Sequence, residues 1–435
     1  MFARFSNLGL SSQIFVGLIG GIIFGFILVL LSSFNDTLAN FITTYIIGAF
    51  DIIKKLFVNA LKMVVVPLVL VSLICGTCSL SDPKKLGSLA GKSISLYLIT
   101  TAIAITLSLT LANIFDPGAN ITTQTTDYVA KQAPALTEVL SSIVPDNPIK
   151  AMADGNMLQV IIFAILFGIA ISRAGESGQK IALLFNSFNE VVLKLVTLIM
   201  QIAPYGVFCI MSAVILQTGT ESILNLIKYF ILVAVSLLIH MSITYPLLLL
   251  VFTGLSPLPL LTKLRPAMLF AFSTSSSAAT LPVTMEVARK RLGVDKTTAS
   301  FTLPLGATIN MDGTAIMQGV ATVFIAQISG VDLTMSQYLT VILMATLASI
   351  GTAGVPSVGL VMLTMVLTQV NLPTEAIAML LGVDRLLDMM RTTVNITGDA
   401  TIATIVSKSN GDLLTDVYND KDAGHKFENT ELKSN

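Results

Sequence analysis

Long apolar stretches alternate with short polar connections along most of this chain. Six of them are roughly 20 residues long, the length that an α-helix needs to cross the hydrocarbon core of a bilayer. Their apolar residues are continuous instead of alternating, so the shorter strands of a transmembrane β-barrel fit poorly. The predicted spans cover residues 14–32, 56–80, 94–115, 155–172, 191–216 and 227–254.

The pattern changes after residue 257. Residues 258–290 and 335–370 are hydrophobic but are interrupted by small residues and proline, whereas 298–325 and 375–407 are predicted to be further spans. Both interrupted stretches contain the pattern S-x-x-x-A-x-x-P, and the span after each contains N-x-x-G. The basic residues put the first interruption on the cytoplasmic side and the second outside, so the repeat is inverted. Paired interruptions in an inverted repeat indicate the midplane site of a secondary transporter.

Orientation is predicted from lysine and arginine in the short loops, which favour the cytoplasmic side. No basic residue lies between Lys296 and Arg385, and this gap suits external loops. Three lysines do not fit this orientation, because they lie where the outer end of the second span is expected: Lys54, Lys55 and Lys62. We therefore expect cytoplasmic termini, a long external connection over 116–150 and a flexible polar tail from about 409. The basic residues that support this orientation are Arg4, Lys84, Lys85, Arg173, Lys180, Lys263, Arg265, Arg289, Lys290, Arg291 and Lys296.

Composition agrees with a membrane protein and excludes several other classes. Hydrophobic residues make up 54% of the chain and charged residues 11%, where a soluble domain carries about a quarter. The net charge is zero, so nothing indicates nucleic-acid binding. Three cysteines and two histidines offer no metal centre, and no nucleophile, phosphate-loop or zinc-protease motif is present. We expect an all-α polytopic membrane protein that is not an enzyme and has no cofactor.

The segment Gly382–Asp399 carries the densest charge within any predicted span. Asp384, Asp388, Arg391 and Asp399 recur with Asn395 at intervals of three or four residues, which aligns them along one side of a helix. An ionisable group at bilayer depth costs at least roughly 2.5–3.5 kcal/mol, so such a row indicates a functional site. The alternative is a salt-bridged face packed against another helix.

A second polar segment, Asn310–Thr314, combines helix-breaking residues with Asp312. Unwound carbonyls beside a carboxylate suit a hard cation, whereas the alternative is a kinked structural helix. Asp312, Asp384, Asp388 and Asp399 with Arg385 and Arg391 leave two net negative charges. An anionic substrate is therefore expected to enter such a site together with cations.

Four segments together resemble the dicarboxylate/amino acid:cation symporter family, which includes archaeal aspartate transporters and mammalian excitatory amino acid transporters. They are STSSSAATLP at 273–282, SFTLPLGATINMDGT at 300–314, ASIGTAGVP at 348–356 and DxxxDxxRTxxNxxGD at 384–399. The resemblance covers nearly the whole chain except the tail. It implies eight transmembrane helices plus two re-entrant helical hairpins as inverted repeats, in a homotrimer with one pathway per protomer.

The same resemblance implies a division of the chain into scaffold and transport parts. The scaffold would comprise 1–80 and 116–222. The transport domain would comprise 81–115, 223–257 and the core 258–408. The polar composition of 409–435, outside the resemblance, predicts a flexible cytoplasmic tail. The protein would lie in the cell membrane with both termini in the cytoplasm.

Residue roles follow from the matched motifs. Arg391 would hold the side-chain carboxylate of the substrate by a bidentate pair, and Asp388 would receive its α-amino group. The other substrate-binding residues would be Ser275, Ser276, Ser277, Thr314, Val355, Gly359, Thr392 and Asn395.

Sodium ligands follow from the same comparison and fall into three sets. Gly306, Asn310, Asn395 and Asp399 would hold one ion; Thr308, Ser349, Ile350 and Thr352 a second; Tyr97, Thr100, Thr101, Asn310 and Asp312 a third.

This chain departs from the family pattern at two positions. Ser275 replaces an arginine of archaeal members, whose charge Arg385 is a candidate to supply. Gln318 replaces a glutamate that mammalian members use in proton carriage. His240 is interpreted as a packed, hydrogen-bonded histidine, with a proton relay as the alternative.

The expected function is sodium-coupled uptake of acidic amino acids, glutamate or aspartate. The alternatives are a proton-coupled glutamate symporter, a C4-dicarboxylate symporter, an ion channel, and a receptor that binds amino acids without moving them. Dicarboxylate carriers lack the acid at Asp388, and proton-driven relatives can replace Asp399 by asparagine.

Overall fold

The computed structural model describes residues 10–79, 83–118, 144–218, 221–350, 358–420 and 423. Within these residues all regular structure is helical, so the expected fold class is confirmed at that level. In the same residues, five helices are long and apolar enough to cross a membrane. The predicted total of eight spans and two hairpins stays a prediction. Thr352, Val355 and most of the expected external connection lie outside the described residues.

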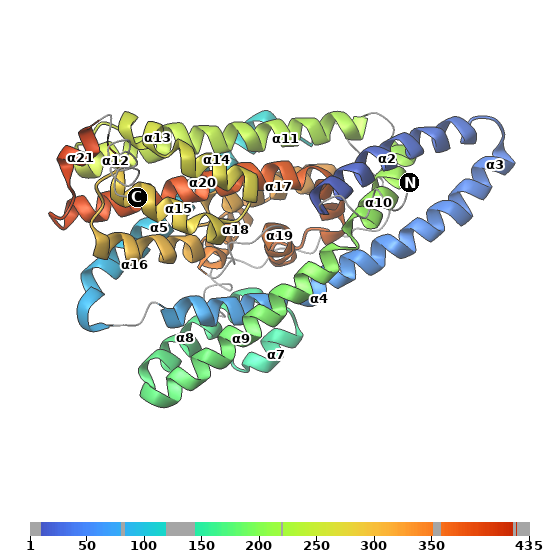
Figure 1. The fold of residues 1–435 in the computed structure, drawn as a ribbon. Helices are drawn as coiled ribbons and strands as arrows, with labels where there is room; N and C mark the ends of the chain where they lie inside the picture. The colour runs from blue at the N-terminus through green and yellow to red at the C-terminus, as the bar shows by residue number, and fades with distance from the viewer. Residues whose placement is uncertain are drawn as a thin grey trace, which may run out of the picture.

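The first helix that the structure describes forms a close pair with a helix from much later in the chain (Figure 1). Helix α2 (Leu10–Ser32) packs along α10 (Ala203–Thr218) through Gly17, Gly21 and Gly25, which recur every four residues. A Cβ at Gly21 would lie 2.6 Å from the carbonyl oxygen of Phe208, and the other two glycines are equally crowded. Small residues at this spacing let membrane helices approach closely.

A second group of helices lies beside this pair. Helix α3 (Asp36–Phe41), the π-helix η1 (Ile42–Ile47) and α4 (Gly48–Ser79) form a continuous rod. Helices α8 (Met157–Arg173) and α9 (Gly175–Met200) pack on α4, and the short α7 (Pro148–Ala153) precedes them.

The predicted single span over 191–216 is wrong. The chain leaves the helix at Gln201 and Ile202, between α9 and α10. Pro204 explains the break, because proline has no N–H to bond the carbonyl of Met200, four residues back, and its ring clashes with that carbonyl. Hydrophobicity is continuous across this turn, so an apolar window alone could not reveal it.

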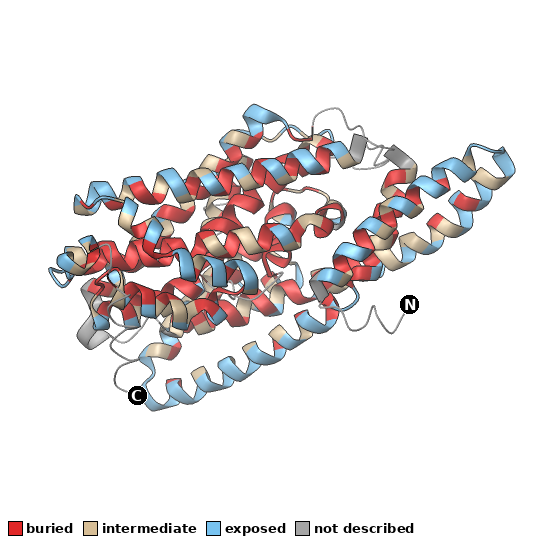
Figure 2. Ribbon diagram, turned by 45° about the horizontal axis from the view of Figure 1, so that its top comes forward, coloured by how far each residue is buried: buried red, intermediate tan, exposed pale blue. Residues whose placement is uncertain are grey.

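The remaining helices form a bundle around α20 (Ile377–Ser409) (Figure 1). Its outer members are α5 (Pro83–Phe115), α11 (Glu221–Ile239) and α12 (Tyr245–Thr253), the last two joined by the π-helix η2 (His240–Thr244). Buried residues concentrate in this bundle (Figure 2). Large apolar side chains such as Leu183 and Val191 of α9 are exposed, as a lipid-facing surface requires.

The first interrupted stretch is a helical hairpin. After α13 (Leu258–Lys263), α14 (Arg265–Thr274) ends at Ser275, whose φ of 51° is left-handed. Ser276 then caps α15 (Ser277–Lys290) by accepting the backbone N–H of Ala279. We call α14 and α15 hairpin 1.

The second interrupted stretch gives α18 (Met335–Ser349) and α19 (Val358–Gln369), with residues 351–357 outside the description. We call α18 and α19 hairpin 2. The 3₁₀ turn η3 (Thr374–Ala376) leads from it into α20.

The two N-x-x-G segments differ in structure. Asn310 and Met311 separate α16 (Lys296–Ile309) from α17 (Asp312–Ile328), with extended backbone at Asn310. In contrast, α20 runs unbroken through Asn395 and Gly398, and Asp399 lies beside the break between α16 and α17 through its contact with Asn310. The neighbours of Gly398 explain why glycine stands there without a break. A Cβ would collide with the Tyr245 hydroxyl and the Asn310 amide.

The expected flexible tail does not begin at 409. Helix α21 (Thr415–Asn419) is docked on the base of hairpin 1, and Tyr418 is fully buried. The Tyr418 hydroxyl donates to the Ser256 carbonyl at 2.8 Å, and the Leu414 N–H donates to the Gly293 carbonyl at 2.9 Å. Lys263 adds three bonds to backbone carbonyls of this region.

Candidate substrate and cation site

Helix α20 presents the predicted row of ionisable residues to the interior of the bundle. Asp384, Asp388, Arg391 and Asp399 are all buried, and Arg391 is fully so. Arg391 donates from Nη1 to Asp384 Oδ1 at 2.9 Å and from Nη2 to Asp388 Oδ1 at 2.7 Å. The seven- and three-residue separations within one helix place both acids on the side of the arginine.

Arg385, although adjacent to Asp384 in the sequence, forms its ion pair elsewhere. Arg385 instead approaches Asp388, with 3.8 Å between Nη1 and Oδ2. Asp388 therefore lies between two guanidinium groups. A buried charge needs such partners, because an isolated ion in a low-dielectric interior is very costly.

Thr314 and Gly359 lie beside the Arg391 guanidinium. A Cβ built on Gly359 would lie 3.4 Å from Arg391 Cζ and 3.2 Å from Thr314 Cγ2. Thr392 donates its hydroxyl to the Asp388 carbonyl at 2.8 Å. The structure thus gathers these predicted substrate-binding residues around one buried arginine, contributed by α17, α19 and α20.

The serines of hairpin 1 lie at its break, and both legs of the hairpin pack on α20. Ser275, Ser276 and Ser277 are all buried. Ser275 has a left-handed backbone conformation, and its Oγ has no hydrogen-bond partner among the described residues. An unpaired buried hydroxyl is a group that a polar ligand can satisfy. Val355, expected in the second hairpin, lies outside the described residues.

The break between α16 and α17 is held by side chains from α20. Asn395 Oδ1 accepts the backbone N–H of Gly313 at 2.8 Å, which satisfies one of the free N–H groups at the start of α17. Asn310 Nδ2 donates to Asp399 Oδ1 at 2.9 Å and to the Asn395 carbonyl at 3.0 Å. These contacts bring together three of the four residues predicted to hold one ion.

Gly306, the fourth, also lies against this group. A Cβ there would collide with Asp399 Oδ1 and would lie 2.5 Å from the Tyr97 hydroxyl. Asn310 Oδ1 is buried and has no hydrogen-bond partner among the described residues. A carbonyl oxygen without a donor, beside two carboxylates, is an acceptor suited to a cation.

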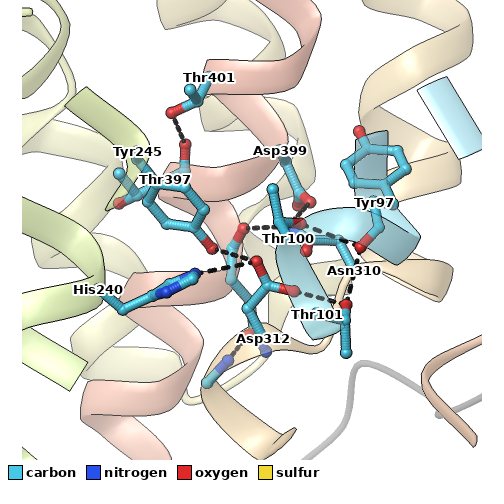
Figure 3. A network of polar contacts seen from close by, with 12 residues as sticks. Tyr97, Thr100, Thr101, His240, Tyr245, Asn310, Asp312, Thr397, Asp399 and Thr401 are labelled. Carbon is cyan, nitrogen blue, oxygen red and sulfur yellow. Dashed lines mark hydrogen bonds and ion pairs between the residues drawn. The ribbon is translucent and has the colours of Figure 1, made fainter. Parts of the chain in front are cut away.

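Figure 3 shows the predicted third set, Tyr97, Thr100, Thr101, Asn310 and Asp312, gathered in one buried network. Thr101 donates to Asp312 Oδ1 at 2.6 Å. Thr100 and Thr101 both donate to the Tyr97 carbonyl, and the Tyr97 hydroxyl donates to the Thr302 carbonyl at 3.0 Å.

The second predicted set is not brought together by the described contacts. Thr308 donates within α16 to the Leu305 carbonyl, and Ser349 donates within α18 to the Thr346 carbonyl. Thr352 lies outside the described residues. The assignment of Thr308, Ser349, Ile350 and Thr352 stays a prediction.

The sequence did not indicate Tyr245 as part of this network, and it indicated only part of the role of His240. The Tyr245 hydroxyl donates to Asp312 Oδ2 at 2.8 Å, and His240 Nε2 lies 3.2 Å from the same oxygen (Figure 3). His240 is thus packed and hydrogen-bonded, as interpreted, but its partner is a predicted cation ligand. His240 stands out in the sequence as an ionisable residue within an apolar span, but nothing in the sequence indicates that Asp312 is its partner or that Tyr245 joins the contact.

The atoms of the site that could bind a cation are mainly oxygens. Among the described residues, no group of three or more histidine, cysteine, aspartate or glutamate side chains could hold a metal ion. Two carboxylates with amide, hydroxyl and carbonyl oxygens match instead the preference of hard cations for oxygen.

A helical membrane protein with buried charges and an interrupted helix at one site has the features of a secondary transporter. The chain matches the model of the sodium:dicarboxylate symporter family over residues 10–409. It belongs to that family, and it is therefore a multi-pass membrane transporter and not an enzyme.

Curated relatives cover most of the chain. The proton/sodium-glutamate symport protein of Bacillus caldotenax is 35% identical over 415 residues, 93% of this chain and 95% of the relative. The proton/glutamate-aspartate symporter of Escherichia coli is 33% identical over 366 residues, 81% of this chain and 83% of the relative. Excitatory amino acid transporter 2 of Mus musculus is 36% identical over 421 residues, 82% of this chain and 73% of the relative.

Proposed function

We propose that this protein is a symporter that takes up glutamate or aspartate together with sodium ions. The observation that carries the substrate assignment is the buried pair of Arg391 and Asp388, 2.7 Å apart. An acidic amino acid has a distal carboxylate for the guanidinium and an ammonium for the carboxylate. The names of the similar proteins, which are glutamate and aspartate symporters, support the same substrate class.

The arrangement around Arg391 indicates how the substrate binds. Asp384 and Asp388 pair with the two terminal nitrogens of the guanidinium. The distal carboxylate of the substrate replaces one of them in a bidentate pair, and the released Asp388 takes the ammonium. Binding therefore exchanges charged partners at Arg391 and Asp388, while the α-carboxylate of the substrate adds one negative charge to the site.

Sodium is the cation that the oxygen set supports best. Asn310 Oδ1, the carboxylates of Asp312 and Asp399 and the neighbouring hydroxyls offer hard oxygen ligands. The four acids and two arginines of the site leave two net negative charges before an anionic substrate arrives. Entry of cations with the substrate removes that excess charge.

Proton coupling is the second candidate. It is favoured by the names of the Bacillus and Escherichia coli relatives, which include protons. A C4-dicarboxylate has no ammonium for Asp388 and fits less well. A channel would conduct ions without substrate.

The packing of the hairpins is consistent with alternating access between two groups of helices. Hairpin 2 packs through α19 on α4 and α8, and its residues from Val358 to Leu367 are buried. Hairpin 1 packs on α16 and α20 of its own bundle. With hairpin 1 on the cytoplasmic side, this packing corresponds to a cytoplasm-facing state. We place the scaffold in α2, α4 and α7–α10, and expect a homotrimer with both termini in the cytoplasm.

Uptake into proteoliposomes tests the proposal. Labelled glutamate and aspartate are offered with a sodium gradient at equal pH on both sides, then with a proton gradient and no sodium. We expect concentrative uptake with sodium alone. Uptake that ignores sodium and follows the proton gradient would assign the chain to the proton-coupled group.

Asp399→Asn provides a second test of the coupling ion. This variant removes a carboxylate oxygen beside Asn310 and should weaken sodium binding. Because linkage between two ligands is reciprocal, substrate affinity at low sodium should fall in parallel. Equal sodium dependence in the variant and the wild type would contradict the assignment of Asp399.

A further inference from the structure

His240, the first residue of η2, and Tyr245, the residue that follows η2, reach the same carboxylate oxygen of Asp312. The Tyr245 backbone N–H donates to the His240 carbonyl, which is the i to i+5 bond of a π-helix. Residues five apart are then about one turn apart on the same side. In an α-helix of 3.6 residues per turn they would point about 140° apart. The π-helical turn is therefore what lets both side chains meet Asp312.

The two oxygens of the Asp312 carboxylate differ in how many polar groups contact them. Oδ2 faces both the Tyr245 hydroxyl at 2.8 Å and His240 Nε2 at 3.2 Å, whereas among the described residues Oδ1 accepts only Thr101 at 2.6 Å. A carboxylate has about four acceptor positions, two on each oxygen. One position on Oδ1 is left, on the side of the predicted cation ligands Thr101 and Tyr97.

The two side chains also hold each other in place. Their rings pack edge to face with 4.6 Å between centroids at an angle of 70°. His240, Tyr245 and Asp312 are all fully buried. The Asp312 carboxylate is the partner that the described residues give the imidazole, since Nδ1 has none there. The hydrogen bond of the imidazole is therefore made to this carboxylate.

We propose that His240 and Tyr245 are positioning residues for the coupling cation. They fix Oδ2 of Asp312, stop rotation of the carboxylate and so present Oδ1 to the ion. This inference rests on the proposed sodium coupling. Groups that orient a metal-binding side chain in this way commonly change cation affinity by about 10- to 100-fold when removed.

Tyr245→Phe is the sharpest test, because it removes one hydroxyl and keeps the ring that packs on His240. Purified protein is titrated with sodium chloride at constant ionic strength, and the rise of Tm without substrate gives the half-saturating sodium concentration. We expect that concentration to rise about 10-fold or more. His240→Leu should act in the same direction, and His240→Gln, which can keep a donor near the Nε2 position, should restore much of the loss.

Tyr418→Phe is the matched control. It also removes a buried hydroxyl with a hydrogen bond to the protein, but at α21, away from Asp312. It should change the starting Tm without changing the half-saturating sodium concentration. A sodium response in Tyr245→Phe equal to that of the wild type, or an equal shift in both tyrosine variants, would overturn the positioning role.

Substrate binding separates positioning from general damage. In Tyr245→Phe, the Kd for aspartate should rise at low sodium and return to the wild-type value at saturating sodium, because only the ion is bound more weakly. A Kd that stays raised at saturating sodium would contradict the proposal. If sodium does not stabilise even the wild type, sodium coupling itself fails, and the positioning role fails with it.

Discussion

Arg391 is a buried cation held by two acids of its own helix, and its loss has two consequences. Arg391→Cys removes the partner of the distal substrate carboxylate, which is worth roughly 1.5–3 kcal/mol, or about one to two decades of affinity. It also leaves Asp384 and Asp388 without their closest cation. We expect glutamate and aspartate binding to collapse, while small neutral amino acids such as serine gain affinity.

Isothermal titration with aspartate and serine measures both changes. Arg391→Cys combined with Asp384→Asn is the control, since it removes one stranded acid and should recover stability without recovering aspartate binding. Wild-type aspartate affinity in Arg391→Cys would show that the guanidinium does not bind the substrate.

Asp388 distinguishes an amino acid from a dicarboxylate. Asp388→Asn removes the charge that balances an ammonium, so aspartate affinity should fall by at least about tenfold. Succinate has no ammonium and should lose much less. Competition binding with both ligands measures the difference, and equal losses would remove the argument for an amino acid substrate.

At the scale of helices, Lys263 connects α21 with the two ends of hairpin 1. Its ammonium donates to the carbonyls of Arg291, Val417 and Tyr418 at 2.7–2.8 Å. Lys263→Met keeps most of the apolar stem but leaves buried carbonyls unpaired, so unfolding should become easier by roughly 1.5–3 kcal/mol. Tm and the rate of proteolysis within 411–419 measure the loss.

Lys296→Met serves as the control for that variant, because Lys296 is an exposed lysine on the neighbouring α16. It should leave Tm and proteolysis nearly unchanged. If Lys263→Met behaves in the same way, the docked α21 does not depend on this lysine.

Sequence periodicity predicted helices and the charged row of α20 because both are repeated local signals. A three- and four-residue spacing fixes one side of a helix whatever surrounds it. The same spacing favours Arg391 over the adjacent Arg385 as the partner of Asp384, because neighbouring residues of a helix do not face each other. The contact of Tyr245 with Asp312 depends on a π-helical turn, and apolar sequence carries no sign of that turn.

At the scale of the whole molecule, α2 of the proposed scaffold contacts α20 of the bundle. This contact defines how the two groups of helices lie relative to each other in the structure. A Cβ at Gly382 would lie 3.1 Å from Leu18 Cγ, so glycine is what allows this approach. Lys62 of α4 also pairs with Glu375 of η3 at 2.9 Å, although both side chains are partly exposed. An exposed pair contributes about 0–1 kcal/mol, so the helix contact is the better point to test.

Cysteines at Leu18 and Gly382 should trap this position if transport requires the two helix groups to part. In a background with Cys75, Cys78 and Cys209 replaced by serine or alanine, oxidation should form a disulfide, because the two sites lie within its usual reach. Uptake should then stop, and reductant should restore it. Single-cysteine variants treated alike should keep their uptake. Full transport by the oxidised, cross-linked protein would show that α2 and α20 stay together through the transport cycle. In that case α2 would not belong to a scaffold that moves relative to α20.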